Sequence, residues 1–181
     1  MSLVGQEGVG LSGDHAKLRV QTEGVSFDSM HLPRGVRISE GGSLTMVSCT
    51  STGHSILVGT NASLSMTDTR VCGSNGRGVD CDGDLTATRC IFEESGYCGL
   101  WIGSDFPTEA AAELVDCVIR KNNGSGVAVN WGKLLMRGGT IRENGWHGVH
   151  VYHGGARSPL QRLQRTSYRP SARTIQSTTG A

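Results

Sequence analysis

The sequence contains the stretch Asn123-Gly124-Ser125-Gly126-Val127-Ala128-Val129, in which a Gly follows Asn by three residues and two apolar residues then flank one variable position. Further copies begin at Asn75, Gly96 and Gly145, and two looser copies lie earlier in the chain. The equivalent positions are Gly35, Ser55, Gly78, Gly99, Gly126 and Gly148, with spacings of 20, 23, 21, 27 and 22 residues. A repeat of this length with one short strand per unit is typical of a solenoid.

The apolar positions of the repeat form two columns. One contains Val36, Ile56, Val79, Leu100, Val127 and Val149, and the other contains Ile38, Val58, Cys81, Ile102, Val129 and Val151. Because residues i and i+2 of a strand lie on one face, we expect both columns to stack inside the solenoid. The residues between them share no property, as expected of an outward face: Arg37, Leu57, Asp80, Trp101, Ala128 and His150.

A second strand-like segment precedes the first by about nine residues in each unit. It supplies a column of small residues, Thr69, Cys90, Cys117 and Gly139, and a column of bulky ones, Val71, Phe92, Ile119 and Ile141. Two or three parallel strands per turn predict an all-β fold, a right-handed parallel β-helix of about six coils. We place this domain at residues 1–155, with the repeat most regular from 43 to 153.

The repeated glycines are expected to serve the corners of the coils. Gly78, Gly99, Gly126 and Gly148 stand where the chain enters a strand, and only Gly reaches positive φ without steric cost. The position three residues earlier holds Asn75, Gly96, Asn123 and Gly145, residue types that also tolerate the left-handed region. We therefore expect positive φ at both sets of positions.

The Asn-Gly-x-Gly-Val-x-Val units resemble the parallel β-helix repeats of the pectate-lyase-like superfamily. They are similar to the repeats of carbohydrate-binding proteins and sugar hydrolases, and of some F-box-type ubiquitin ligase adaptors. The resemblance covers the central coils and rests on structural residues. It therefore implies the fold more directly than any activity.

Composition narrows the classes of partner. The net charge is +1, so the chain as a whole lacks the excess charge of nucleic-acid-binding or anionic-membrane-binding proteins, and we expect neither partner. Residues 156–181 form a basic Ser/Arg-rich tail, which we expect to be irregular. No apolar run approaches the length of a membrane span, and no signal peptide is evident, which predicts a cytoplasmic protein, or a secreted one if the chain is a fragment.

The six cysteines match no zinc-ligand spacing, and three of them, Cys81, Cys90 and Cys117, occupy inward columns. Reduced, buried thiols are therefore expected, together with an intracellular location. No metal and no cofactor are expected in this protein.

Asp80, Asp82 and Asp84 alternate along one strand and its exit, so their carboxylates are candidates for calcium binding or for acid–base work. In the resembling lyases, such acidic residues act beside a basic residue. No Lys or Arg is expected next to the three aspartates, since Arg37 lies two coils away. A solvated acidic face is the alternative. Asp80 and Asp82 are thus candidate catalytic residues only in a secondary hypothesis.

The aromatic residues give the main candidate site. Trp101, His150 and Tyr152 are expected to point outward, with Trp131 and Trp146 on adjoining turns. A longer loop at residues 103–113 follows Trp101 and carries Asp105. Exposed rings stack on sugars and also anchor protein interfaces. The alternative is that Trp101 packs under its own loop.

We therefore expect a non-catalytic binding module that engages a glycan or a protein surface through Trp101, Asp105, His150 and Tyr152. The second hypothesis is a polysaccharide lyase or glycoside hydrolase of the pectate-lyase-like type, complete or truncated. A spacer within a larger architecture is a third. We expect a monomer or a part of a larger assembly.

Overall fold

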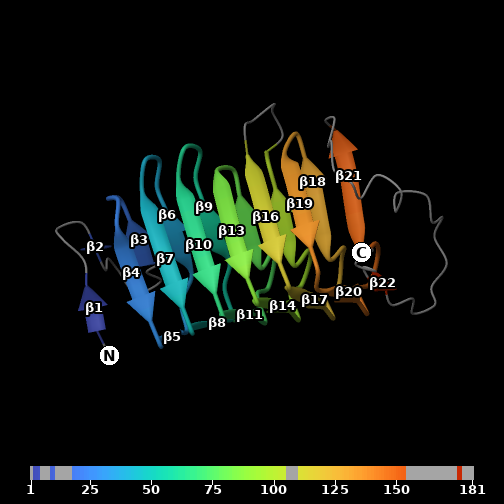
Figure 1. Cartoon of the computed structure of the whole chain (residues 1–181), viewed down its shortest axis with the longest axis horizontal. Helices are drawn as coiled ribbons and strands as arrows, with labels where there is room; N and C mark the ends of the chain where they lie inside the picture. Colours follow the sequence, from blue (N-terminus) through green and yellow to red (C-terminus); the bar gives the residue numbers. More distant parts are fainter. Residues whose placement is uncertain (1, 5–8, 11–17, 105–109, 154–174, 177–181) are drawn as a thin grey trace.

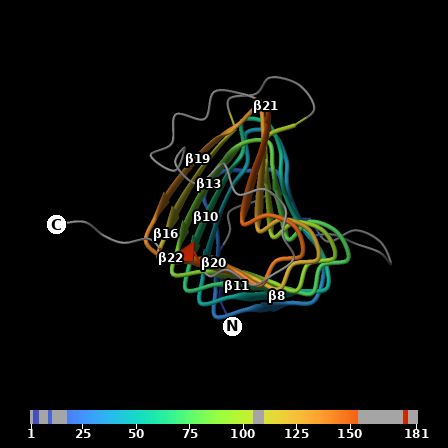
Figure 2. The same cartoon turned by 90° about the vertical axis from the view of Figure 1, so that its right-hand side faces the viewer.

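The computed structural model describes residues 2–4, 9–10, 18–104, 110–153 and 175–176, and these residues form a right-handed parallel β-solenoid built from strands (Figure 1). Three parallel sheets, here called A, B and C, run along it. Viewed along its axis, the solenoid has one sheet on each of three sides (Figure 2). Each coil passes through sheet A, then C, then B, which confirms the predicted fold and the estimate of about six coils.

The strands of coils 1 to 6 follow one order in each sheet. Sheet A contains β4 (Val25–Asp28), β7 (Ser43–Val47), β10 (Ser63–Thr67), β13 (Asp84–Thr88), β16 (Ala111–Val115) and β19 (Lys133–Arg137). Sheet C contains β5 (His31–Leu32), β8 (Thr50–Thr52), β11 (Arg70–Cys72), β14 (Ile91–Glu93), β17 (Val118–Arg120) and β20 (Thr140–Arg142). Sheet B contains β6 (Val36–Ile38), β9 (Ile56–Val58), β12 (Val79–Cys81), β15 (Leu100–Ile102), β18 (Val127–Asn130) and β21 (Val149–His153), preceded by β3 (Leu18–Val20).

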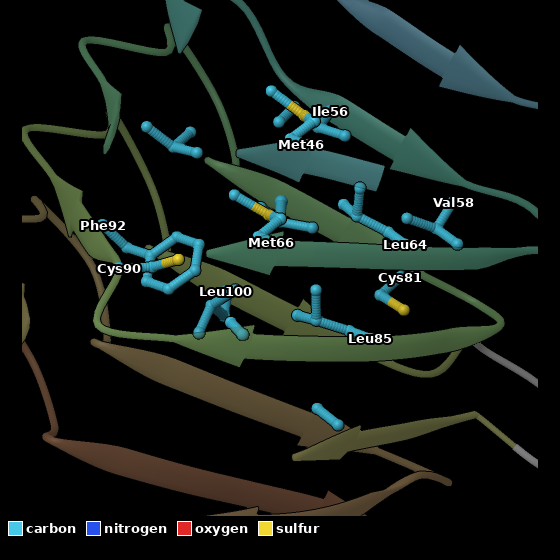
Figure 3. Close-up of a cluster of buried hydrophobic side chains, with 14 of the residues drawn as sticks. Met46, Ile56, Val58, Leu64, Met66, Cys81, Leu85, Cys90, Phe92 and Leu100 are labelled. Atoms are coloured by element: carbon cyan, nitrogen blue, oxygen red, sulfur yellow. The ribbon is translucent and has the colours of Figure 1, made fainter. Parts of the chain in front are cut away.

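The interior is made of the predicted columns. In sheet B, Val36 pairs in register with Ile56, and the pairing continues through every coil to Val149, while the second column runs in parallel from Ile38 to Val151. In sheet C, Phe92 stacks between Val71 and Ile119. Figure 3 shows part of this core, where side chains from all three sheets meet. Each coil therefore buries its apolar residues against the equivalent residues of its neighbours.

The predicted second strand is in fact two strands, because the chain bends sharply inside it. The link between each sheet A strand and the following sheet C strand contains a residue of positive φ: Ser29, Ser48, Asp68, Arg89 and Asp116 in coils 1 to 5, and both Gly138 and Gly139 in coil 6. In coils 1 to 5, a single left-handed residue at this point turns the chain without a loop. Glycine occupies this corner only in coil 6, so the corner tolerates several residue types.

The prediction that the repeated glycines and asparagines have positive φ is wrong. Gly78, Gly99, Gly126 and Gly148 are not among the residues of positive φ, and neither are Asn75, Gly96, Asn123 and Gly145. They are small because adjacent coils touch there: a Cβ at Gly78 would lie 2.5 Å from the carbonyl oxygen of Gly99. A Cβ at Gly126 would lie 2.7 Å from the carbonyl oxygen of Gly148. Close backbone stacking, rather than backbone conformation, selects glycine at these positions.

Short antiparallel strands lie on three sheet edges. β1 (Ser2–Val4) pairs with β4, and β2 (Val9–Gly10) pairs with β3, at the N-terminal end of the solenoid. At the other end, β22 (Ile175–Gln176) pairs with β20. Apart from β22, the basic tail at 156–181 lies outside the described residues.

All six cysteines lie within the described residues and all are buried free thiols. Cys81, Cys90 and Cys117 are inward-facing members of the main core, as predicted. Their sulfurs donate weak hydrogen bonds to backbone carbonyls, such as that of Cys81 to Gly83. They act as small apolar side chains that fill the interior.

Candidate functional site

Trp101 lies on the outer face of sheet B, as the alternation of β15 predicts, but it is not exposed. Its neighbours Leu100 and Ile102 point into the main core, whereas Trp101 forms a separate apolar cluster with Cys98 and Ala128. Only 7% of Trp101 is exposed. The expectation of an exposed Trp101 ring is therefore wrong, and the reason is that other side chains cover it.

Polar contacts also fix the Trp101 ring. Its Nε1 donates a hydrogen bond to the carbonyl oxygen of Gly103 at 2.7 Å. The Arg77 guanidinium lies over the ring, 3.8 Å from its centroid, in a cation–π contact. Arg77 in turn donates to both carboxylate oxygens of Asp80, at 2.8 and 2.9 Å. An arginine thus stands directly beside Asp80, which corrects the expectation that no basic residue lies near the three aspartates.

Five aromatic rings from coils 4 and 6 make one continuous surface. Tyr97 contacts Trp146 edge to face at a centroid distance of 5.4 Å, and Trp101 contacts Tyr152 at 5.4 Å. Tyr97 and Trp101 are 6.4 Å apart, and the hydroxyls of Tyr97 and Tyr152 lie 3.5 Å apart. His150 stacks on Tyr152 at 4.0 Å. We call Tyr97, Trp101, Trp146, His150 and Tyr152 the aromatic platform.

Small residues in coil 5 make the platform possible. Gly124 lies between Tyr97 and Trp146 in the backbone stack, since it donates to the Tyr97 carbonyl and accepts from the Trp146 amide. On the strands, Ala128 lies between Trp101 and His150 in register. Because neither residue has a large side chain, rings two coils apart reach each other across coil 5.

The platform presents two of its rings to solvent. Trp146 is 56% exposed and Tyr152 is 37% exposed, and they are the exposed large hydrophobic residues of the described part of the chain. Tyr97 and Trp101 lie beside and beneath them. The outer rings therefore rest on inner rings rather than on mobile aliphatic side chains.

The platform is neutral at physiological pH. Burial, with the nearby His147 imidazole, lowers the pKa of His150, which favours the uncharged ring. Burial, together with the hydrogen bond to Tyr97, raises the pKa of Tyr152 to about 12. The charge of Arg77 is balanced by Asp80. The surface offers a ligand apolar ring faces, two phenol hydroxyls and the His150 imidazole.

A comparison of the sequence with protein-family models supports the β-helix fold. A family model described as a right handed beta helix region matches residues 7–162. The chain belongs to this family. No curated protein and no solved structure gives a significant match.

The three aspartates of this β-helix have separate surroundings. Asp80 is paired with Arg77 on β12, whereas Asp84 is exposed at the start of β13, in sheet A. Asp82 is partly buried between the two strands. Within the described residues, no group of three or more His, Cys, Asp or Glu side chains has the arrangement of a metal site.

The loop after Trp101 is shorter than predicted, because β16 begins at Ala111 and the predicted loop residues 111–113 belong to the strand. Asp105, the acidic member of the predicted site, lies outside the described residues. Among the described residues of this β-helix, no helix has the length and apolar character needed to cross a lipid bilayer.

The structure therefore brings together three predicted site residues, Trp101, His150 and Tyr152. It adds Tyr97, Trp146 and Arg77, which were not included in the predicted site. The repeat alignment contained the signal for the first two, because Tyr97 and Trp146 occupy the same position of the motif in coils 4 and 6. Arg77 stands three residues before Asp80, with Gly78 between them.

Proposed function

We propose that this β-helix is a non-catalytic module that binds a glycan on its aromatic platform. The observation that carries the proposal is the pair of exposed rings, Trp146 and Tyr152, supported from behind by Tyr97 and Trp101. Pyranose rings have apolar C–H faces that pack on aromatic rings, and their hydroxyls accept and donate hydrogen bonds at the ring edges. In the proposed complex, the Tyr152 hydroxyl makes one of these hydrogen bonds.

The rigidity of the platform favours ligand binding. An exposed aromatic side chain that is already packed loses little conformational freedom when a ligand arrives, so less of the contact energy is lost to ordering. Each exposed ring has at least one ring contact: Trp146 with Tyr97, and Tyr152 with Trp101 and His150. The resemblance of the repeats to those of carbohydrate-binding proteins also supports a glycan.

The test is binding of the purified protein to an array of neutral and acidic glycans, followed by titration calorimetry with the best ligand. Replacing one stacking ring removes about 0.5–1.5 kcal/mol, so Trp146→Ala or Tyr152→Ala should raise Kd by roughly two- to tenfold. Leu57→Ala is the matched control, because Leu57 stands in the same outward column of sheet B in coil 2. It should bind as the wild type does.

The control and the ring variants must all keep the wild-type circular dichroism spectrum and cooperative unfolding. If no glycan binds, or if the double variant Trp146→Ala, Tyr152→Ala binds as tightly as the wild type, the proposal is wrong. Such a result would leave the platform as a protein-interaction surface.

A further inference from the structure

Glu93 is a buried carboxylate on the outside of the solenoid. It lies on β14 in coil 4, next to Phe92, whose side chain points into the core. Glu93 therefore faces outward from sheet C, yet only 2% of its side chain is exposed. Among the buried residues of the described chain, it is the one with a formal charge.

Two arginines from the neighbouring coils cover this carboxylate. Arg70 of coil 3 donates from Nε to Oε1 at 2.6 Å and places a terminal amino group 2.5 Å from the same oxygen. Arg120 of coil 5 donates from Nε to Oε2 at 2.6 Å. Each carboxylate oxygen is thus assigned to one arginine, so Glu93 determines the orientation of both guanidinium groups.

The carboxylate is charged at neutral pH. Its burial alone favours the neutral acid, but the hydrogen bonds from Arg120 and Arg70 outweigh burial and lower the pKa of Glu93. The arginines are only partly covered, with 45% of the Arg70 side chain and 30% of the Arg120 side chain exposed. The Glu93 carboxylate is therefore buried, whereas the guanidinium groups of Arg70 and Arg120 are partly exposed to solvent.

The arginines retain donors for a further acceptor. A guanidinium has five N–H donors in a planar fork, and Glu93 uses the Nε of Arg120. Within the part of the chain that the structure describes, Arg120 makes no second side-chain hydrogen bond. Arg142 of coil 6 pairs in register with Arg120 and forms an ion pair with Glu143. The outer face of sheet C therefore carries arginines on coils 3, 5 and 6.

We propose that Arg70 and Arg120, oriented by Glu93, form an oxyanion-binding site on the outer face of sheet C. Guanidinium groups bind planar carboxylates and tetrahedral sulfate or phosphate through paired N–H donors. Glu93 is a positioning residue, since it aims the donors and does not touch the ligand. The site lies on a different sheet from the aromatic platform and does not depend on the proposed glycan binding.

The experiment is NMR titration of the full chain with sodium sulfate, phosphate or acetate, at an ionic strength held constant with sodium chloride. The arginine Nε–H resonances are the direct readout. Saturable shifts at Arg70 and Arg120 with a tetrahedral or a planar anion are expected, and the preferred shape identifies the ligand class. An absence of saturable shifts up to about 10 mM, which corresponds to about −2.7 kcal/mol, would overturn the proposal.

Glu93→Gln separates a positioned site from general attraction between charges. The substitution removes one negative charge, so attraction by net charge alone would strengthen anion binding. Loss of orientation should instead weaken it, by about tenfold or more, since charge-assisted hydrogen bonds depend on geometry. Stronger binding in Glu93→Gln would overturn the proposal.

Two further variants guard against misfolding and non-specific effects. Arg120→Lys keeps the charge but loses the planar fork, and it should also bind more weakly. Wild-type affinity in Arg120→Lys would count against the site. Arg89→Gln is the control, because Arg89 forms an exposed ion pair with Asp68 away from Glu93, and its loss should leave the affinity unchanged.

Discussion

The ring of Tyr97 meets the ring of Trp146 edge to face at 5.4 Å, although coil 5 passes between the two coils that carry them. Adjacent parallel strands are about 4.8 Å apart, so residues two coils apart are normally separated by an intervening side chain. Gly124 occupies the intervening position and has no side chain. The contact therefore depends on a glycine as much as on the two rings.

Adding a side chain at Gly124 should disrupt the platform. A Cβ there would lie 3.0 Å from the carbonyl oxygen of Tyr97 and 3.2 Å from its Cδ2, so the two extra methyl groups of Val must displace a ring. We expect Gly124→Val to lower the free energy of unfolding by about 1–3 kcal/mol and to change the tryptophan fluorescence. Chemical denaturation and emission spectra measure both effects.

Gly76→Val is the matched control for this prediction. Gly76 is the equivalent residue in coil 3, and nothing lies within 4 Å of a Cβ built on it. Its substitution should alter stability by no more than about 0.5 kcal/mol. Equal effects at Gly76 and Gly124 would show that the rings do not need the gap.

The interior of sheet C should be sensitive to cavities. Phe92 is fully buried between Val71 and Ile119, so Phe92→Ala should cost about 3–5 kcal/mol of unfolding free energy. Ile91→Ala, at the adjacent outward position, should cost about 1 kcal/mol or less. Urea denaturation of both variants tests the difference, and similar losses would contradict the inward assignment of Phe92.

Acid should weaken the Arg70–Glu93–Arg120 cluster. The pKa of Glu93 is lowered in the folded state, whereas an unfolded Glu has a pKa of about 4.3. The stabilisation is therefore present above about pH 4.3 and is lost as the pH falls through the folded-state pKa. Thermal unfolding from pH 7 to pH 3 should show a gap between wild type and Glu93→Gln that narrows at the acid end. A constant gap would contradict the ion pairing.

The cysteines should react slowly in the native protein. All six are buried, and the most exposed, Cys72, has 8% of its surface accessible. Burial raises the pKa of the Cys81 thiol to about 12, so little reactive thiolate exists there at pH 8. We expect no more than one thiol to react quickly with Ellman's reagent at pH 8, and all six after denaturation. Rapid reaction of several native thiols would rule out the packing of the inward columns.

The coil-to-coil register could be predicted from the sequence because it repeats. Apolar and variable residues alternate in every repeat unit, so each unit by itself indicates which residues belong to the columns from Val36 to Val149 and from Ile38 to Val151. The exact role of Gly78 could not be read in this way. Gly78 must lack a Cβ because the carbonyl oxygen of Gly99 in the next coil lies too close to it. This close approach arises only when the coils stack, so the sequence of one coil does not reveal it.

The candidate sites were harder to predict because they depend on side chains from different coils. The burial of Trp101 requires Tyr152, which lies fifty-one residues later in the chain, and the small Ala128 between them. Glu93 gave no signal as an isolated glutamate. It becomes notable only when the register of sheet C brings it beside Arg120 and near Arg70.

The alternation of large and small residues along sheet B also bears on how such a protein changes during evolution. The interior repeats with every coil, so the gain or loss of one coil would leave each inward column continuous. The rings on the outside come from coils 4 and 6, with Gly124 and Ala128 of coil 5 as spacers. If coil 5 alone were lost, the inward columns would still be continuous, but Tyr97 and Trp146 would lie on adjacent coils without Gly124 between them. The core therefore tolerates the gain or loss of a single coil, whereas the aromatic platform depends on the spacing that coil 5 provides between coils 4 and 6.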